Sequence, residues 1–422
     1  MKARAAALWL LAAACAAPRP VLPVDEQLAL VELALREGRL EDASTLLRQV
    51  RRRAPRDAAA AAWSATLAAM LWDDDLAVHE QQVAVREARA AGADAGVVAT
   101  LRGRLGDYLF QAGRWWECAA PLTEGAVEAS ATRRRAFAAI AATLPFLRKL
   151  AGPLLTEQAL LPGDAPEMVC GVADRQRPFA IDTGTSMTTV ARAFAEELGV
   201  VGLQPAGDAI DGSGRQLVVA VGVLPQFVIG DIEVGATPVL VVDDAALSLR
   251  DLHGGPERVP RGVLGLDLVA ACRLTLDPER RSVVLELPRG LPDAGSVQCV
   301  RAEGRCLVPV LVEGARLWFV LDSGASHSSL TTAGLCRLPG GERRAVPTFR
   351  RVRGVGGSSL AVREVRDLVL QCSEARFESV SLPIVERGGA GLFPVHGVLG
   401  RDVLGQCRVT LDRGRLRLTT LS

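Results

Sequence analysis

The chain has 422 residues, which is too long for one ordinary hydrophobic core and predicts two or three domains. A hydrophobic content of 49% with 23% charged residues excludes a disordered or fibrous protein. The formal net charge is +1 and Arg is interspersed with Asp and Glu, so a nucleic-acid partner is not expected.

The first segment, residues 1–17, has the pattern of a bacterial-type export signal. A basic start precedes the apolar run 5–11, and small residues leading to Cys15 follow it. The apolar run is too short to span a bilayer, so a removed signal peptide is expected rather than an anchor helix. Cys15 resembles the lipidated cysteine of lipoproteins, for which the Pro-rich residues 18–24 would be a tether. The protein is therefore expected to be exported, either periplasmic, lipid-anchored or secreted, with membrane contact only through Cys15.

Residues 25–150 are rich in Ala, Leu, Arg and Glu with helical spacing, and predict an all-α domain. Two stretches carry small and large residues at the positions of a tetratricopeptide repeat. The first uses Leu30, Val31, Ala34, Gly38, Ala43, Leu47, Val50 and Pro55, and the second Leu105, Gly106, Leu109, Gly113, Cys118 and Leu122. Residues 63–91 would form a degenerate middle repeat. The segment thus resembles a short tetratricopeptide array. A scaffold is favoured, and a surface for a protein partner stays open.

From Met168 onward the segments become short, Val-rich and separated by turns, which is typical of all-β structure. The pattern occurs twice, in unit 1 (165–287) and unit 2 (305–420), with residues 288–304 as a linker. The predicted strands are 217–223, 226–229, 238–242 and 283–287 in unit 1, and 306–312, 317–321, 360–365, 368–370, 380–385 and 415–419 in unit 2. A short helix is expected over 191–199. The fold class is therefore multidomain: helical repeats followed by duplicated, mainly-β units.

The two units share three matching motifs. Residues 179–186 read FAIDTGTS and residues 319–326 read FVLDSGAS. Further along, GVLGLD at 262–267 matches GVLGRD at 397–402, and CRLTLD at 272–277 matches CRVTLD at 407–412. In each first motif an apolar strand delivers an Asp into a tight turn containing Gly. Two carboxylates on matching turns are the ingredients of a paired-Asp hydrolase.

Each unit resembles a retropepsin-type aspartic protease subunit, the half-sized fold that normally dimerises to form one active site. The resemblance covers residues 165–420 and rests on the duplicated Asp-Thr/Ser-Gly turns and the Gly-rich segments downstream. It implies that Asp182 and Asp322 form a catalytic dyad sharing one proton, because two adjacent carboxylates cannot both ionise easily in a partly dry cleft. A water held between them would attack the peptide carbonyl.

The resemblance also assigns support of the dyad to the two turns. The residues concerned are Thr183, Gly184, Thr185, Ser323 and Gly324. Thr183 and Ser323 would cross-link the turns through their hydroxyls, and the two Gly residues would offer backbone N–H groups to the carboxylates. Thr185 can add a hydroxyl to its Asp, whereas Ala325 cannot, so the two carboxyls are expected to be inequivalent.

Two Gly-rich hairpin tips are candidates for flaps that close over a bound peptide. They comprise Asp211, Gly212, Ser213 and Gly214 in unit 1 and Gly354, Val355, Gly356 and Gly357 in unit 2. Each tip alone would be read as a surface turn. Their matched placement in the two units favours flaps.

The remaining polar residues have structural interpretations. Asp267 and Asp402 are expected to cap or brace the segments that follow them. None of the four His residues has a counterpart in the other unit, which disfavours a Ser-His enzyme or a metal hydrolase. Eight Cys remain beyond Cys15, and they permit disulfides whose pairing stays open. Cys272 and Cys407 are expected to be buried and not paired with each other. With no CxxC motif, no metal and no cofactor are expected.

The sequence predicts an aspartic endopeptidase that cleaves an extended polypeptide with a dyad formed inside one chain. A non-catalytic peptide-binding module with a protease-like cleft on a helical scaffold is the alternative from another class. In a third arrangement, each unit would pair with the equivalent unit of another chain.

Overall fold

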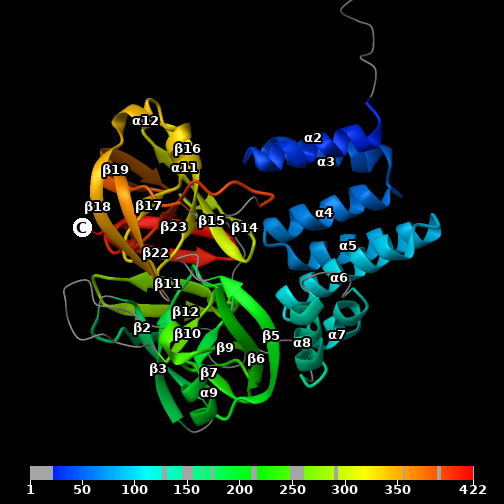
Figure 1. The fold of residues 1–422 in the computed structure, drawn as a ribbon, viewed down its shortest axis with the longest axis horizontal. Coiled ribbons are helices and arrows are strands. Elements are labelled where there is room, and N and C mark those ends of the chain that lie inside the picture. Colours follow the sequence, from blue (N-terminus) through cyan, green and yellow to red (C-terminus); the bar gives the residue numbers. More distant parts are fainter. Residues whose placement is uncertain are drawn as a thin grey trace, which may run out of the picture.

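The computed structural model describes residues 22–125, 131–144, 155–163, 165–172, 175–210, 216–247, 261–288, 293–354, 357–386 and 391–421. A helical region stands beside two β units that are stacked on each other (Figure 1). This arrangement confirms the predicted order of helices followed by mainly-β units. Among the described residues, no helix is long and apolar enough to cross a membrane.

The helical region contains seven helices within the described residues. They are α2 (Val24–Arg36), α3 (Leu40–Arg53), α4 (Ala58–Met70), α5 (Asp74–Ala90), α6 (Ala95–Gln111), α7 (Trp115–Glu124) and α8 (Ala131–Ala141). Successive helices pack against each other as antiparallel neighbours. Gly38 and Gly113 have positive φ angles at the turns inside the two expected repeats, and Trp72 takes the corresponding position in the middle pair. The helix pairs fit the expected repeat pattern, and their tetratricopeptide identity stays a prediction.

Unit 1 is built on a sheet with strand order β5-β6-β9-β4-β10-β3-β2-β7-β8 among the described residues. Its elements are β2 (Glu167–Val172), β3 (Arg175–Ile181), β4 (Thr189–Ala191), α9 (Arg192–Glu197), β5 (Val201–Ile210), β6 (Gln216–Leu224), β7 (Phe227–Ile229), β8 (Ile232–Glu233), β9 (Thr237–Val242), η1 (Asp244–Ala246), β10 (Gly262–Leu264) and α10 (Leu266–Val269). Here β10 runs parallel to β3, while β5 and β6 form a long hairpin.

Unit 2 repeats this plan with strand order β17-β21-β16-β15-β19-β18 among the described residues. Its elements are β14 (Val300–Ala302), β15 (Arg305–Val312), β16 (Ala315–Leu321), β17 (Ser329–Leu330), α11 (Thr332–Arg337), α12 (Gly341–Arg344), β18 (Val346–Gly354), β19 (Gly357–Cys372), β20 (Ala375–Pro383), β21 (Gly397–Leu399) and α13 (Arg401–Leu404). The prediction of separate strands at 360–365 and 368–370 is wrong, because β19 is continuous. Its register against β20 shifts there, and Asp367 has a φ of 52°.

A third sheet joins the two units in the order β1-β12-β11-β22-β23-β13. Its strands are β1 (Leu155–Ala159), β11 (Arg273–Asp277), β12 (Ser282–Glu286), β13 (Val297–Gln298), β22 (Cys407–Asp412) and β23 (Arg415–Thr420). The duplicated motifs themselves meet here as antiparallel β11 and β22, where Thr275 pairs with Thr410. Unit 1 therefore begins with β1, ahead of residue 165. The expected linker 288–304 is corrected as well, since β13 and β14 occupy 297–302 and pair with strands of the units.

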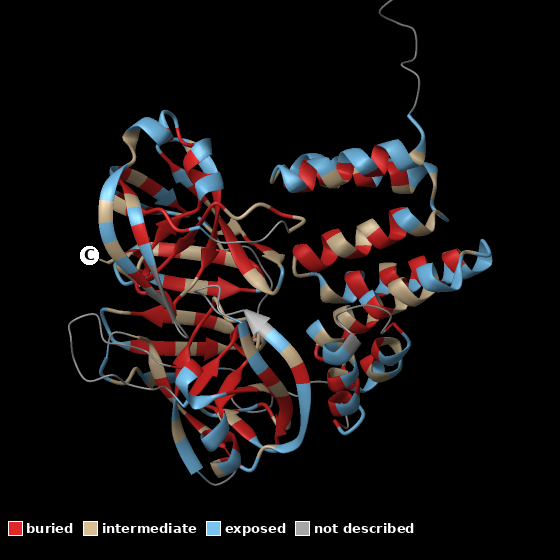
Figure 2. Ribbon diagram, in the orientation of Figure 1, coloured by how far each residue is buried: buried red, intermediate tan, exposed pale blue. Residues whose placement is uncertain are grey.

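Reciprocal ion pairs strengthen this joining sheet. Arg408 of β22 lies 2.6 Å from the carboxylate of Asp277 in β11, and Arg273 lies 3.5 Å from that of Asp412. Burial alone would raise the pKa of Asp277, but the N–H of Arg280 and the Arg408 guanidinium outweigh it and lower that pKa. The sheet thus holds the units together through matched residues. Figure 2 shows that its strands are largely buried.

The helical region docks on unit 2 through two tryptophans. The indole of Trp72 lies against the backbone of Gly414, and the Arg301 guanidinium stands 4.5 Å from its ring. The same guanidinium pairs with Asp74 and donates to a carbonyl of α4. From the other side, Trp318 Nε1 donates to the carbonyl oxygen of Gly38 over 3.2 Å. Helices α2 to α4 and the outer wall of unit 2 therefore share one buried core.

Helix α8 contacts unit 1 instead. It packs across β5 and β6, where Ile140 Cδ1 lies 3.6 Å from the position of a Cβ added to Gly202. The guanidinium of Arg133 donates to the carbonyl oxygen of Asp208 in the same hairpin. The helical region thus contacts both units, and in unit 1 it covers the hairpin whose tip is a flap candidate.

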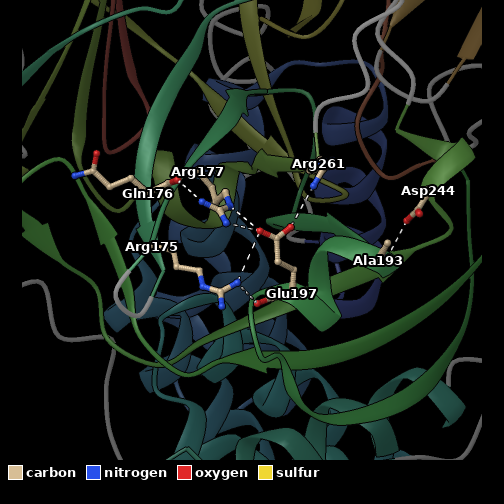
Figure 3. A network of polar contacts seen from close by, with 7 residues as sticks. All are labelled: Arg175, Gln176, Arg177, Ala193, Glu197, Asp244 and Arg261. Carbon is tan, nitrogen blue, oxygen red and sulfur yellow. Dashed lines mark hydrogen bonds and ion pairs between the residues drawn. The ribbon is translucent and has the colours of Figure 1, made fainter.

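Helix α9 of unit 1 is fixed by a cluster of arginines around Glu197 (Figure 3). The Glu197 carboxylate accepts from Arg177 Nε at 2.9 Å and from Arg261 Nη1 at 3.1 Å, and Arg175 donates to the Glu197 carbonyl oxygen. The hydrogen bond from Arg177 is the main reason why the pKa of Glu197 is lowered. These bonds tie α9 to β3 and to the start of β10.

Eight cysteines lie among the described residues and form no disulfide with one another there, and seven of them are buried. Cys272, just before β11, and Cys407, the first residue of β22, are both buried as expected. Burial raises the pKa of Cys407 to about 12. Its thiol donates weakly to carbonyl oxygens of α13 at 3.5 and 3.8 Å, so it acts as a packing residue.

Candidate active site

Both candidate aspartates stand immediately after a buried strand. β3 ends at Ile181, and the N–H of Asp182 donates to the carbonyl oxygen of Leu264 in β10 over 3.0 Å. In unit 2, Asp322 follows β16 and donates in the same way to Leu399 of β21 over 3.1 Å. Because the preceding strands are apolar and buried, each Asp is delivered into the interior at the contact between the units.

The two carboxyl groups meet across this contact. A Cβ added to Gly184 would lie 2.4 Å from Cγ of Asp322, and a Cβ added to Gly324 would lie 2.5 Å from Cγ of Asp182. Real Cβ atoms do not approach other atoms so closely, so each carboxyl needs the glycine of the opposite unit. The structure therefore brings Asp182 and Asp322 together within one chain.

Reciprocal hydrogen bonds lock the two turns together. Thr183 Oγ1 donates to the carbonyl oxygen of Leu321 over 2.8 Å and accepts from the N–H of Ser323 over 3.1 Å. Ser323 Oγ donates to the carbonyl oxygen of Ile181 over 2.8 Å and accepts from the N–H of Thr183 over 3.1 Å. These four bonds are buried and span about 140 residues of sequence. This is the hydroxyl cross-link that the sequence predicts.

The two carboxyls have unequal partners within their own turns. Asp182 accepts from the N–H of Gly184 and from the hydroxyl of Thr185, both over 2.8 Å. Asp322 accepts over 2.7 Å from the N–H of Ala325. The expected donation from Gly324 is thus corrected to the following residue, because the turn of unit 2 points that N–H at the carboxylate.

Burial and a neighbouring charge set the protonation of this pair. Burial first, and then the charge of Asp322, raise the pKa of Asp182 to about 7, although the Thr185 hydroxyl and the Gly184 N–H act in the opposite direction. The residue Asp182 is only 4% exposed, whereas Asp322 is half-buried. A pair in which one carboxyl keeps its proton near neutral pH is what general acid-base chemistry needs.

A second pair of aspartates supports the turns from behind. Asp267 Oδ1 accepts from the N–H and hydroxyl of Thr188 at 2.8 and 3.0 Å, and Asp402 Oδ1 accepts from those of Ser328, both at 2.7 Å. They hold the residues just after the dyad turns. Asp402 Oδ1 also accepts from the N–H of Val403 over 3.0 Å, so it braces the segment that follows it, as expected. Sequence reasoning missed Thr188 and Ser328, although the repeated hydroxyl six positions after each Asp was a visible signal.

The flap candidates lie at the tips of the hairpins β5–β6 and β18–β19. Asp211, Gly212, Ser213, Gly214, Val355 and Gly356 fall outside the described residues, as does the lipidation candidate Cys15. In unit 2, Gly354 and Gly357 face each other where the two strands end. The hairpins are therefore present in matching places of both units, and the role of their tips stays a prediction.

In the described part of the chain, Ser326 Oγ lies 2.8 Å from Nδ1 of the adjacent His327. There, no three His, Cys, Asp or Glu residues are grouped so that they could hold a metal ion. His396 is buried and its Nδ1 accepts from the N–H of Trp318 over 3.0 Å. Burial lowers the pKa of His396 to about 4, so it is a neutral packing residue.

Comparisons with known proteins give one family model and several solved structures. The family model described as aspartyl protease matches residues 168–268 and 308–403. No curated protein matches the chain. Among solved structures, a retropepsin-like aspartic protease from Rickettsia conorii matches with 20% identity over 33% of this chain and 96% of its own, at a TM-score of 0.24.

Two seed proteins also match. Basic 7S globulin from soybean has 11% identity over 64% of this chain and 95% of its own, with a TM-score of 0.33. Conglutin gamma, a basic 7S globulin from lupine seeds, has 10% identity over 64% and 96%, with a TM-score of 0.36. The family model covers both β units, and the predicted helical region precedes them. The aspartyl protease model thus matches one segment in each of the two tandem β units.

Proposed function

We propose that this protein is an aspartic endopeptidase whose single active site is formed by Asp182 and Asp322 of one chain. The observation that carries the proposal is the meeting of the two carboxyls, each packed on the glycine of the opposite unit. The family match supports a protease and hence a polypeptide substrate. Since both turns come from one chain, catalysis would not require a dimer.

In the proposed mechanism the dyad holds one proton between its two carboxyls. The ionised carboxyl takes a proton from a water lying between them, while the other donates its proton to the oxygen of the scissile carbonyl. The resulting tetrahedral intermediate collapses as the leaving amine is protonated. Because the apparent pKa values belong to the pair, acid and base are not assigned to individual residues. Thr183 and Ser323 would keep the carboxyls at a fixed separation throughout.

The proposed substrate is an extended stretch of polypeptide lying between the dyad and the hairpins β5–β6 and β18–β19. Their tips, residues 211–214 and 354–357, would close over it and hydrogen-bond its backbone. Closure would exclude water other than the reacting one and strengthen the electrostatic interactions of the dyad.

The test is cleavage of a peptide library by the purified protein between acid and neutral pH, beside Asp182→Asn and Asp322→Asn. Each substitution is expected to lower the cleavage rate on the order of a thousandfold, since each removes an essential proton carrier. Asp243→Asn is the matched control because its side chain is 74% exposed and pairs only with Arg192 among the described residues.

Three outcomes would contradict the proposal. Cleavage that survives in both dyad variants would place the activity elsewhere or in a contaminant. Specific peptide binding without cleavage at any pH would favour the peptide-binding module, in which the same cleft holds peptide without hydrolysing it. Activity that appears only in a dimer would indicate that units of two chains are paired.

We also propose that the protein acts outside the cytoplasm, on the basis of the basic start and apolar run of residues 1–17. Cell fractionation of the wild type and of Cys15→Ser checks this. A lipoprotein would move from the membrane to the soluble exported fraction on substitution, whereas a secreted protein would be unaffected. Recovery of both forms from the cytoplasm would reject export.

A further inference from the structure

The outer face of the hairpin β18–β19 carries three exposed apolar side chains, here called the hairpin patch. Phe349 is 85% exposed, Leu360 58% and Val362 57%. Leu360 and Val362 alternate along β19 and so share one face, and Phe349 lies in the bulge of the neighbouring strand between Pro347 and Arg350. Exposed apolar side chains that cluster in this way mark an interaction surface more often than scattered ones do.

The duplicated unit shows what covers the same surface elsewhere in the molecule. In the equivalent hairpin of unit 1, Val219 and Val221 alternate along β6 and are buried to 2% and 0% exposure. Helix α8 packs across that hairpin, and its Ala138 and Ile140 belong to the same buried core as the two valines. Helix α8 thus packs across one hairpin, although Val218 of β6 is still 69% exposed. Among the described residues, the hairpin patch is exposed on the side of unit 2 that faces away from the helical region (Figure 1).

The positive charge around the hairpin patch limits the kind of partner that can bind there. Residues 341–366 contain seven Arg and two Glu, so positive charge remains in excess although Arg363 pairs with Glu342 and Arg366 with Glu364. Arg351 is exposed and lies directly opposite Leu360 in the strand pairing, so it borders the apolar side chains. A second copy docked by the same hairpin would bring two arginine clusters together, which is unfavourable. Helix α8 is also unsuited, because it carries Arg133, Arg134 and Arg135.

We propose that the hairpin patch binds an amphipathic helix of a separate protein that carries acidic residues beside its apolar face. This helix would cover β18–β19 as α8 covers β5–β6, while its carboxylates meet the arginines of the hairpin. The surface is distinct from the dyad, and the inference does not depend on the proposed catalysis. Salt is expected to weaken the contact, since these charges are exposed.

The probe for this contact is a labelled synthetic peptide of residues 131–144 with Arg133→Glu, Arg134→Glu and Arg135→Glu. Its binding to the full chain is measured by fluorescence anisotropy at low and high salt. Saturable binding is expected. The double variant Leu360→Ser with Val362→Ser, and the single variant Phe349→Ser, are each expected to weaken it at least about tenfold. The unmodified peptide, with its three arginines, is expected to bind about tenfold less tightly or worse.

Trp116→Ser is the matched control, because Trp116 is 64% exposed on α7, outside the hairpin patch. Thermal unfolding of every variant shows whether it remains folded, and Arg351→Glu tests the charge contribution without changing the apolar residues. Binding that is absent, or equal in all variants, would overturn the proposal. Two other results would also overturn it. One is that the chain binds anionic phospholipid vesicles through Phe349 but does not bind the peptide. The other is that the chain sediments as a dimer and that Phe349→Ser dissociates this dimer.

Discussion

The two β units have the same interior and different surroundings. Both deliver an Asp from a buried strand, and both brace the turn with a second Asp and a hydroxyl. Outside this centre they diverge, since α8 packs across the hairpin of unit 1 while the hairpin patch of unit 2 is exposed among the described residues. The difference shows that the two dyad turns, which contact each other between the units, must match. The outer faces of the units do not contact each other and can therefore form different contacts.

The largest effect is expected from adding one methyl group beside the dyad, at the glycine of either turn. Gly184→Ala and Gly324→Ala each place a Cβ within 2.4 or 2.5 Å of the opposite carboxyl carbon. Both are expected to abolish peptide cleavage and to destabilise the fold by about 1–3 kcal/mol through overpacking. Cleavage assays and thermal unfolding check this. Gly96→Ala is the control, as its Cβ would meet only the Asp94 side chain, at 3.0 Å. Retained activity in either variant would contradict the close meeting of the carboxyls.

The reciprocal cross-link predicts equal effects in the two units. Thr183→Ala and Ser323→Ala each leave a buried backbone N–H and a buried carbonyl without their partner, at a cost of about 1–3 kcal/mol per group. Urea unfolding is expected to show similar losses for both variants, and Thr183→Ser is expected to restore most of the stability. If only one of the two variants lost stability, or neither did, the proposed cross-link between the turns would be refuted.

The raised pKa of Asp182 predicts that stability depends on pH. The folded state binds the proton more tightly than the unfolded state, so this contribution is present below about pH 4 and is lost as pH rises towards about 7. Asp182→Asn removes the charge, and it is expected to raise the melting temperature above that of the wild type at pH 7 to 8 but not at pH 4. Melting curves of both proteins from pH 4 to pH 8 test this. A difference in melting temperature that is the same at every pH would argue against a desolvated carboxyl.

The smallest effect concerns the position at which only one of the two turns carries a hydroxyl, Thr185 against Ala325. Thr185→Ala makes the turn of unit 1 like that of unit 2 and removes a hydroxyl that lowers the pKa of Asp182. The alkaline limit of cleavage is expected to move to higher pH, with a rate loss below about tenfold. The pH-rate profile of the variant measures this shift. A profile that does not move would mean that the hydroxyl does not tune the dyad.

Residues at the dyad were predictable because a repeated motif marks them twice. The aspartates, the hydroxyl cross-link and the extra hydroxyl of Thr185 are found where the sequence predicts them. The donor to Asp322 was not predictable, because both turns carry Gly at the same position, yet Asp182 accepts from Gly184 and Asp322 accepts from Ala325. Residues 297–302 also read as a linker, since strands of two or three residues carry too short a pattern to be recognised.

The docking of the helical region was likewise beyond the sequence. Trp72 stands where the other helix pairs have Gly, and its positive φ looks unfavourable until Arg301 and Gly414 are seen to pack around its indole. No local pattern connects residues more than 200 positions apart.

From the sequence alone one can derive the export pattern, the helical and duplicated β regions, and the two aspartates with their hydroxyl neighbours. These follow from local chemistry and from repetition, which need no knowledge of distant contacts. Only the tertiary structure determines which carboxyl is more deeply buried, which N–H each one accepts from, and which hairpin a helix covers. Those features depend on surfaces assembled from distant segments, where burial and charge act together.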